Sequence, residues 1–582
     1  MLAALSLCAQ GTQVQGQINV SKDLVALGIA PQNAVPGNPD ADARPLFQAA
    51  IQYAAANGIA RVVADPGAYW FLTPQQPGAY LVLDRVSGLT IDLQGSDIYL
   101  LNSFTVGIYL NGCEGVTLTN FTIDYVQLPF TQVRLSGVNP ATGTLSYETI
   151  PGWSTPASLR SPSGSTNYWA IVLRGGSPIP NASRLPLTQP TSSSTLQVIR
   201  DTTPWTQPAV LRTYQPGDII VVTLRDGEAT ILTEGGGGNV VSGVDIYASG
   251  AIGLHLDSAS NSTVNKVRVL PRPGTDRLIS TNADGIHLSY IQNNNSVQLC
   301  YVALTMDDGI ALNSPFLAFV SSASGARSLR VTRNFSTQIP NGTAVSLLNP
   351  ATGQTIGRYV LLSQSPPFHD PNVSKTATYM FDQDLPPVQS GFGLVYADPV
   401  NRGLSSVIQN NDVEKILFAR GIFLGGVTGV TVQENTVRQT NCGGIVLHHD
   451  LAAYPTAANQ DIQVLANTVD RAIGPAAVGT GAIAALGSIF VLATDENFIP
   501  LKAATESNIT ILNNSITNAG RSALWIGNVN GGTVQGNAIG GYDLYPQLAL
   551  WGISEALANK LTVDFTQAVA VHSSLNAKVQ QD

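Results

Sequence analysis

The chain has 582 residues, far more than one compact core usually needs, so we expect several domains or an elongated repeat architecture. Hydrophobic residues make up 44% of the chain and charged residues only 12%, which excludes a disordered protein and is typical of a secreted β-rich one. The net charge of −9, with no basic stripe, excludes a phosphate-backbone partner, so nucleic-acid binding is not expected.

The N-terminus carries an apolar run from Leu2 to Ala9 that resembles the centre of an export signal, without the basic residues that usually precede it. We expect a secreted or periplasmic protein in which residues 1–17 are the remnant of a signal. No apolar run reaches the roughly 18 residues needed to cross a bilayer, so no membrane span is expected. Three dispersed cysteines without metal-like spacing are expected to be small buried hydrophobes: Cys113, Cys300 and Cys442.

The segment DARPLFQAAIQYAAANG, which ends at Gly58, predicts a helix. Gly58 can end this helix because glycine readily adopts the left-handed conformation of a C-terminal cap. The apolar face of the helix is expected to consist of Leu46, Phe47, Ala50, Ile51 and Ala54. A helix over the first coil of a stack hides an open sheet edge, so we interpret this one as an N-terminal cap.

Short alternating apolar runs, each split by an Asn or Gly break, recur through the chain, as in VSGLTIDLQGSDIYL and ESNITILNNSI. Period-2 alternation indicates strands, and the breaks indicate tight turns. Equivalent breaks, such as Gly95 and Asn120 or Asn514 and Asn537, recur at intervals of about two dozen residues. A repeat of this length predicts a right-handed parallel β-helix, an all-β solenoid in which each coil buries its inward side chains against its neighbours. An antiparallel sandwich is the alternative, but the hairpin signals that it needs are scarce.

Two regions break the repeat with Pro-rich turns and strands such as YWAIVLRG and RSLRVTRNF. We expect each region to be a small antiparallel β-barrel-like module inserted between coils. A chain that leaves a solenoid and returns to it usually builds a wall beside a cleft. The expected boundaries are 18–126 for the cap and first coils, 127–235 for the first module, 236–314 for the central coils, 315–418 for the second module, 419–541 for the last coils and 542–582 for a C-terminal segment.

Three aspartates stand out in so weakly charged a chain, in ADGIH and, one repeat later, in DDGIALN. Asp307 and Asp308 follow Asp284 by one such repeat, so the three should sit on adjacent coils about 4.8 Å apart. Such carboxylates repel one another and raise the pKa of one of them, and one protonated acid beside ionised ones is what glycoside hydrolysis needs. Adjacent strand residues face opposite ways, so Asp307 and Asp308 can share a cleft only if the backbone turns at Gly285 and Gly309. The alternative is that all three are turn residues that accept backbone N–H groups.

These motifs resemble the catalytic core of glycoside hydrolase family 110, the α-1,3-galactosidases, and more distantly that of the polygalacturonase family. Arg277 ahead of ADGIH, the segment NFTIDYVQLPFTQ before the first insertion and the positions of both insertions also resemble the galactosidase family. The likeness spans roughly residues 40–540. Gly309 stands where that family usually has proline. The Gly-His-Gly and Arg-x-Lys runs of the polygalacturonase family are absent, which counts against a uronate substrate because its carboxylate needs a cationic partner.

The resemblance implies inverting, single-displacement hydrolysis of an α-linked galactosyl residue, with a glycan or oligosaccharide that ends in α-galactose as the substrate. By matching position, Asp307 is the general acid, and Asp284 and Asp308 hold and deprotonate the attacking water. No metal or cofactor is expected, and a homodimer is left open as the state of assembly.

Further residues are candidates for binding the sugar. His287 and Asn313 are close to the aspartates in the sequence and Arg277 precedes them, although a surface histidine, a turn asparagine and a surface arginine are the respective alternatives. Candidates on other coils are His448, His449, Asp450, Asp124 and Gln132. Zinc at the two adjacent histidines would need a further ligand that the sequence does not offer.

Two other functions stay open at this point. A polysaccharide lyase or a polygalacturonase-like enzyme can use the same solenoid, and a lyase would need both calcium and a cationic base. Three carboxylates can bind calcium, but no lysine lies within the motif. A non-catalytic glycan-binding solenoid would leave the three aspartates as turn residues that point in different directions, and the fold alone does not decide between these functions.

Overall fold

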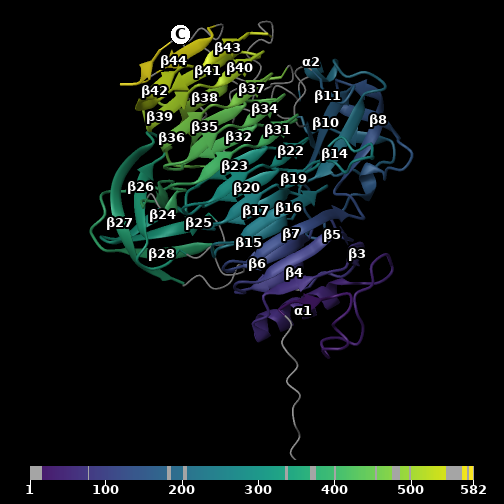
Figure 1. Cartoon of the computed structure of the whole chain (residues 1–582). Helices are drawn as coiled ribbons and strands as arrows, with labels where there is room; N and C mark the ends of the chain where they lie inside the picture. Colours follow the sequence, from purple (N-terminus) through teal and green to yellow (C-terminus); the bar gives the residue numbers. More distant parts are fainter. Residues whose placement is uncertain are drawn as a thin grey trace, which may run out of the picture.

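The computed structural model describes residues 16–580 apart from 76–77, 180–184, 201–205, 207, 228, 335–338, 367–374, 399–400, 452–454, 475–485, 497–499, 545–566, 573 and 575. The expected signal remnant and most of the expected C-terminal segment lie outside these residues. The predicted fold class is confirmed: the chain winds into a right-handed parallel β-helix whose coils stack in sequence order (Figure 1). Among the described residues, no helix is both long and apolar enough to span a membrane.

One face of the stack is an eleven-stranded parallel sheet, which we call the front sheet. Its strands are β4 (Ala79–Asp84), β6 (Val106–Asn111), β15 (Ala229–Glu234), β17 (Ile252–Asp257), β20 (Ile286–Ser289), β23 (Ile310–Asn313), β32 (Ile422–Gly425), β35 (Ile445–Asp450), β38 (Gly487–Thr494), β41 (Ser522–Gly527) and β44 (Val569–His572). The register places Ile286, Ile310, Ile422, Ile445 and Ile489 directly above one another, and all five are buried. Stacked isoleucines of this kind form the core that holds the coils together.

A second, 21-stranded sheet forms the rest of the helix wall. Its strands are β1 (Ile18–Asn19), β2 (Arg61–Val63), β3 (Ala68–Phe71), β5 (Thr90–Leu100), β7 (Thr117–Tyr125), β16 (Val240–Ile246), β18 (Thr263–Asn265), β19 (Arg268–Val269), β21 (Ser296–Gln298), β22 (Tyr301–Ala303), β30 (Val407–Gln409), β31 (Asp412–Glu414), β33 (Thr431–Gln433), β34 (Thr436–Arg438), β36 (Gln460–Leu465), β37 (Thr468–Asp470), β39 (Glu506–Leu512), β40 (Ser515–Thr517), β42 (Val529–Gln535), β43 (Ala538–Gly540) and β45 (Lys578–Val579). From this sheet the chain returns to the front sheet through a segment that we call the return turn, residues 304–309 in the coil of β23.

A ladder of asparagines, all of them buried except the half-buried Asn537 at its end, lies along the inside of the bend in the second sheet. It consists of Asn411, Asn435, Asn467, Asn514 and Asn537, one from each of five successive coils. Each side-chain amide donates a hydrogen bond to the Oδ1 atom of the next, at 2.8–3.0 Å. The ladder satisfies polar groups that the tight turns bury, and the Asn breaks in the sequence mark its positions.

Replacing the central member of this ladder is expected to destabilise the fold. Asn467→Ala leaves the backbone N–H of Asn435 and the carbonyl of Val432 without their partners, and the side-chain amide of Asn435 keeps only its hydrogen bond to the carbonyl of Ile408. We expect a loss of roughly 3 kcal/mol, the cost of a few unsatisfied buried groups. Guanidinium unfolding measures it, with Asn530→Ala as the control because Asn530 is an exposed residue of the same sheet. Equal midpoints for the two variants would contradict a stabilising ladder.

The predicted N-terminal cap is confirmed. Helix α1 (Arg44–Asn57) buries its apolar face against the first coil, and Gly58 ends it with a φ of 65°. Cys113, Cys300 and Cys442 are buried free thiols, as expected.

The first inserted segment folds into a seven-stranded antiparallel sheet, which we call module 1. Its elements are β8 (Phe130–Asn139), β9 (Thr144–Thr149), the 3-10 helix η1 (Pro156–Ser158), β10 (Tyr168–Arg174), β11 (Ser177–Pro178), β12 (Leu185–Leu187), β13 (Thr195–Gln197), α2 (Pro208–Leu211) and β14 (Ile219–Leu224). A bridge between Leu187 and Val198 joins the two ends of the sheet, which makes it barrel-like.

The second inserted segment is a closed six-stranded antiparallel barrel, which we call module 2. Its strands are β24 (Ala318–Gly325), β25 (Ser328–Arg333), β26 (Ala344–Asn349), β27 (Gln354–Ser365), β28 (Thr376–Phe381) and β29 (Gly393–Tyr396). The two modules stand on opposite sides of the stack, module 1 to the right and module 2 to the left (Figure 1). The central coils therefore lie between two walls.

Candidate active site

Asp284, Asp307 and Asp308 lie in two successive return turns, just before β20 and β23. Asp284 and Asp308 occupy the same place in their coils, and the N–H of Gly285 donates to the carbonyl of Asp308 at 2.9 Å. The distance in sequence from Asp284 to Asp308 is thus one coil. Asp307 and Asp308 are both in the irregular turn and not in the strand, so the alternation of a regular strand does not force their side chains apart.

The glycines after these aspartates let the coils approach closely. A Cβ atom on Gly285 would lie 2.3 Å from Cγ1 of Val302 and 2.8 Å from the carbonyl oxygen of Gly309. One on Gly309 would lie 2.5 Å from Cγ1 of Val413 and 2.7 Å from the carbonyl oxygen of Gly421. Close backbone approach is therefore the reason for an Asp-Gly sequence at both places, and it fixes the backbone of the aspartates.

Asp284 is buried and paired with His287. Its Oδ2 lies 2.6 Å from Nδ1 of His287, and its Oδ1 accepts the backbone N–H of Asp308 at 2.9 Å. Burial alone would raise the pKa of Asp284, but the charge of His287 and its hydrogen bond hold that pKa below its usual value. Burial opposes the charge on His287, yet Asp284 raises the pKa of His287 above its usual value. The two form a close carboxylate–imidazole pair, with the side-chain amide of Asn313 3.0 Å from Nε2 of His287.

Asp308 is buried and held by Arg420, which occupies the same place one coil further along. Nε and Nη2 of Arg420 donate to the two carboxylate oxygens at 2.7 and 2.6 Å, and its backbone N–H donates at 2.9 Å. Burial, together with the charges of Asp284 and Asp307, raises the pKa of Asp308 to about 6, against the opposing effect of Arg420. At neutral pH this carboxylate is therefore ionised and fixed in place.

Asp307 is the accessible member of the group. Its side chain is 17% exposed, against 7% for Asp284 and 4% for Asp308. Oδ2 of Asp307 accepts a hydrogen bond from Nη1 of Arg225 at 2.9 Å. Arg225 follows β14, so module 1 contributes a charged side chain to the group.

Module 1 is fastened to the return turn that carries Asp284. The buried amide of Asn282 donates to the carbonyls of Pro129 and Leu224 at 3.0 and 2.9 Å. Leu224 immediately precedes Arg225, and Asn282 lies two residues before Asp284 in the same turn. The side chain of Asn282 therefore fixes the position of Arg225 relative to Asp284.

Carboxylate oxygens of the three aspartates all lie within 4.8 Å of one another. This cluster has the ligand type that a hard cation prefers. Arg225 and Arg420, however, each pair with one of these aspartates, so two fixed cationic side chains already compete with a metal ion for the carboxylates.

The candidates His448, His449 and Asp450 do not act as one unit. His448 lies on the front sheet two coils after Asn313, its Nε2 is 2.9 Å from Oγ1 of Thr494, and its Nδ1 has no hydrogen-bond partner among the described residues. Burial lowers the pKa of His448 to about 4, Asp450 opposes this, and Arg420 adds to it, so the ring is neutral. His449 instead meets Oγ1 of Thr505 at 3.1 Å, below module 2. Of the two histidines, His448 belongs to the surroundings of Arg420, and Asp450, two residues further along β35, lies on the same face of the strand.

The candidates Asp124, Arg277 and Gln132 lie together at the base of module 1, apart from the three aspartates. Arg277 donates to both oxygens of Asp124 at 2.8 and 3.1 Å. Gln132 accepts the N–H of Leu278 at 2.8 Å and donates to the carbonyl of Asp276 at 3.1 Å. These contacts attach module 1 to the coil and hold the walls of the site in place.

No protein-family model and no curated protein matches the chain. Among solved structures, it is similar to the A-module of mannuronan C-5 epimerase AlgE6 from Azotobacter vinelandii, at 11% identity and a TM-score of 0.43, over 94% of this chain and 98% of that one. It is also similar to the catalytic unit of a GH87 α-1,3-glucanase from Streptomyces thermodiastaticus (14%, 0.40, 90% and 60%) and to the Dettilon tailspike protein (13%, 0.42, 92% and 70%). At this level of similarity the matches say nothing about activity.

Proposed function

We propose that the chain is a secreted glycoside hydrolase that cleaves α-linked galactosyl residues, as α-1,3-galactosidases do, by an inverting single displacement. The observation that carries the proposal is the group of three carboxylates within 4.8 Å of one another, with one accessible member and two buried ones. A fold gains no stability by gathering three acids, because each costs solvation and repels the others. General acid–base chemistry is the role that such a group supports best.

In this mechanism Asp307 donates a proton to the leaving oxygen, because it is the aspartate that a substrate can reach. Asp284 and Asp308 hold the attacking water and take its proton, since both are ionised at neutral pH. A general acid must present a protonated oxygen to the leaving group. Oδ2 of Asp307 is occupied by Arg225, so the Arg225–Asp307 pair has to open when a substrate enters.

The distance between the carboxylates makes retention of configuration the second candidate. Inverting enzymes usually hold their two carboxyl groups about 6.5–9.5 Å apart, and retaining ones about 5–5.5 Å apart. The spacing here is nearer to the second value. Asp284 and Asp308 are almost fully buried, however, with side chains only 7% and 4% exposed, so a sugar carbon reaches them less easily than a water molecule does. We therefore favour a bound water as the attacking group.

The charges around the aspartates favour hydrolysis of a neutral sugar over the alternatives. A lyase needs a cation such as calcium and a free base, whereas Arg225, Arg420 and His287 are all engaged by the carboxylates of this cluster. A uronate would need a cationic partner for its own carboxylate. A non-catalytic binding solenoid does not require its acids to converge.

The test of the proposal is to follow an α-1,3-linked galactobioside by proton NMR in the presence of the protein. We expect β-galactose as the first product, since inversion at an α-linked carbon gives the β-anomer. First appearance of α-galactose would support the retaining alternative. If no sugar is released while the protein still binds the galactobioside, hydrolysis is contradicted and the binding solenoid takes its place.

A further inference from the structure

Arg225 brings a cationic side chain of module 1 to the accessible aspartate, and its backbone is fixed on both sides. Its N–H donates to the carbonyl of Asn167 at 3.1 Å, and the N–H of the next residue, Asp226, donates to the carbonyl of Gly250, just before β17, at 3.2 Å. Oγ of Ser165 donates to the carbonyl of Arg225 at 3.3 Å. Because these bonds involve main-chain atoms on the side of Arg225, they hold its Cα atom in place whichever way the side chain points.

The guanidinium group of Arg225 is charged and partly accessible. Its Nη1 donates to Oδ2 of Asp307 at 2.9 Å, and the side chain is 30% exposed. Burial would lower the pKa of Arg225, but the charges of Asp307, Asp284 and Asp308 raise that pKa above its usual value. A guanidinium group has five N–H donors, so this one can hold an acceptor from a substrate beside the proposed general acid.

A substrate has to replace Arg225 at Asp307. Oδ2 of Asp307 can give a proton to a leaving oxygen only after Arg225 has released it. Taking the carboxylate from a partly buried arginine is unfavourable unless another acceptor replaces it. The nearest acceptors in the substrate are hydroxyl groups on the carbons next to the one that carries the leaving oxygen.

The proposed mechanism places the leaving sugar, and not the galactosyl unit, on the side of Arg225. The galactosyl unit has to lie over Asp284 and Asp308, because the water that they hold attacks its anomeric carbon. In an inverting displacement the leaving oxygen departs from the opposite face, which is the side of Asp307 and Arg225. In a 1,3-linked galactobioside this oxygen is on C3 of the leaving galactose, between the hydroxyl groups on C2 and C4.

We propose that Arg225 determines specificity for the leaving sugar: it moves from Asp307 when a substrate enters and donates a hydrogen bond to the 2- or 4-hydroxyl group of that sugar. The inference rests on the proposed hydrolase function and adds to it the recognition of the leaving unit. A leaving group without these hydroxyl groups gains nothing from Arg225.

The test is a cycle between the residue and the two hydroxyl groups. It measures kcat/KM of wild type, Arg225→Met and Arg225→Lys on an α-1,3-linked galactobioside and on its two analogues that lack the 2- or the 4-hydroxyl group of the leaving galactose. A nitrophenyl α-galactoside, whose leaving group has no sugar hydroxyl, reports on the rest of the site. Arg212→Met is the control variant, since Arg212 is an exposed arginine of module 1.

We expect Arg225→Met to lower kcat/KM for the galactobioside by about 10–100-fold, the usual effect of removing a hydrogen bond from a charged donor. In wild type one analogue should show a similar loss. Arg225→Met should hydrolyse that analogue as well as the parent, because the hydroxyl group has already lost its partner. Arg225→Lys keeps a charged donor and should recover part of the rate, and all variants should match wild type on the nitrophenyl substrate.

Two results would overturn the proposal while leaving the hydrolase intact. One is a loss for Arg225→Met on the nitrophenyl substrate as well, which means that Arg225 only maintains the structure of the site. The other is a set of losses that multiply independently for both analogues, which means that Arg225 contacts neither hydroxyl group.

If wild type hydrolyses neither the galactobioside nor the nitrophenyl substrate, the proposed function fails, and calorimetric titration then judges Arg225 separately. Weaker binding of one analogue than of the galactobioside by wild type, with no such difference in Arg225→Met, supports recognition of that hydroxyl group by Arg225. Equal binding of all three sugars by wild type overturns it.

Discussion

Asp307→Asn is expected to lower kcat for an α-1,3-linked galactobioside by about 10²–10⁴-fold, the usual contribution of a general acid. Asparagine keeps the shape of the side chain but has no proton to give to a sugar leaving group. A nitrophenyl α-galactoside needs far less help, because nitrophenolate leaves without being protonated. The same variant should therefore keep most of its kcat on the nitrophenyl substrate.

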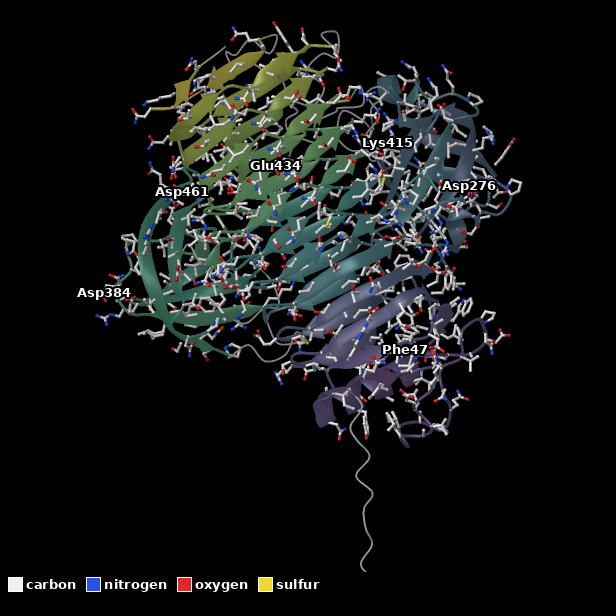
Figure 2. All side chains as sticks on the ribbon, in the orientation of Figure 1. Phe47, Asp276, Asp384, Lys415, Glu434 and Asp461 are labelled. Carbon is white, nitrogen blue, oxygen red and sulfur yellow. The ribbon has the colours of Figure 1, made fainter. Side chains whose placement is uncertain are left out.

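This contrast separates the acid from the base. Asp284→Asn removes the group that activates water, and water is needed whatever the leaving group, so we expect it to lose activity on both substrates. Asp384→Asn is the matched control, because Asp384 lies on the outside of module 2, where its side chain is 71% exposed (Figure 2). An equal loss on both substrates for Asp307→Asn would contradict its role as the acid and make Asp308, the aspartate with the raised pKa, the next candidate.

The repeat period of the sequence was sufficient to predict the solenoid fold and to predict that the three aspartates lie close together. The regular intervals between Asn or Gly breaks match the coils of the solenoid, and the interval from Asp284 to Asp308 is one such coil. The same register would have identified Arg420, because Arg420 occupies in its coil the place that Asp308 occupies in the preceding coil. Module 2 hides that relation, because it separates the two partners by 112 positions in the sequence.

Arg225 could not be found in this way. It belongs to module 1, whose antiparallel strands follow no solenoid period, and its position depends on how Asn282 fastens β14 to the return turn. For the three adjacent residues His448, His449 and Asp450, the sequence instead suggested a single site that contains all three side chains. They look like one cluster in the sequence, but neighbouring side chains of a strand face opposite ways, so His449 points away from His448 and Asp450, and of the two histidines His448 faces the surroundings of Arg420.

Glu506→Gln is expected to change how the stability of the protein depends on pH. Glu506 is fully buried at the start of β39, where its carboxyl oxygens accept the backbone N–H and side-chain amide of Asn459 at 2.5 and 3.1 Å. Burial raises the pKa of Glu506 to about 8, although Asn459 and the nearby Arg402 oppose the shift. The carboxyl group is therefore protonated in the folded protein over a range of pH in which it is ionised in the unfolded chain.

The sign of the effect follows from proton binding. Between the unfolded pKa of about 4.5 and the folded pKa of about 8, the folded state binds more protons than the unfolded state, so the free energy of unfolding falls as pH rises. From pH 5 to pH 8 this one group should remove on the order of 4 kcal/mol, at about 1.4 kcal/mol per pH unit. Glutamine cannot ionise, so the free energy of unfolding of the variant should lack that part of its dependence on pH.

Guanidinium unfolding at pH 5, 6, 7 and 8 compares wild type, Glu506→Gln and the surface control Glu434→Gln. Parallel pH profiles for wild type and Glu506→Gln would mean that the buried carboxyl group is already ionised in the fold, with Asn459 and Arg402 outweighing the effect of burial.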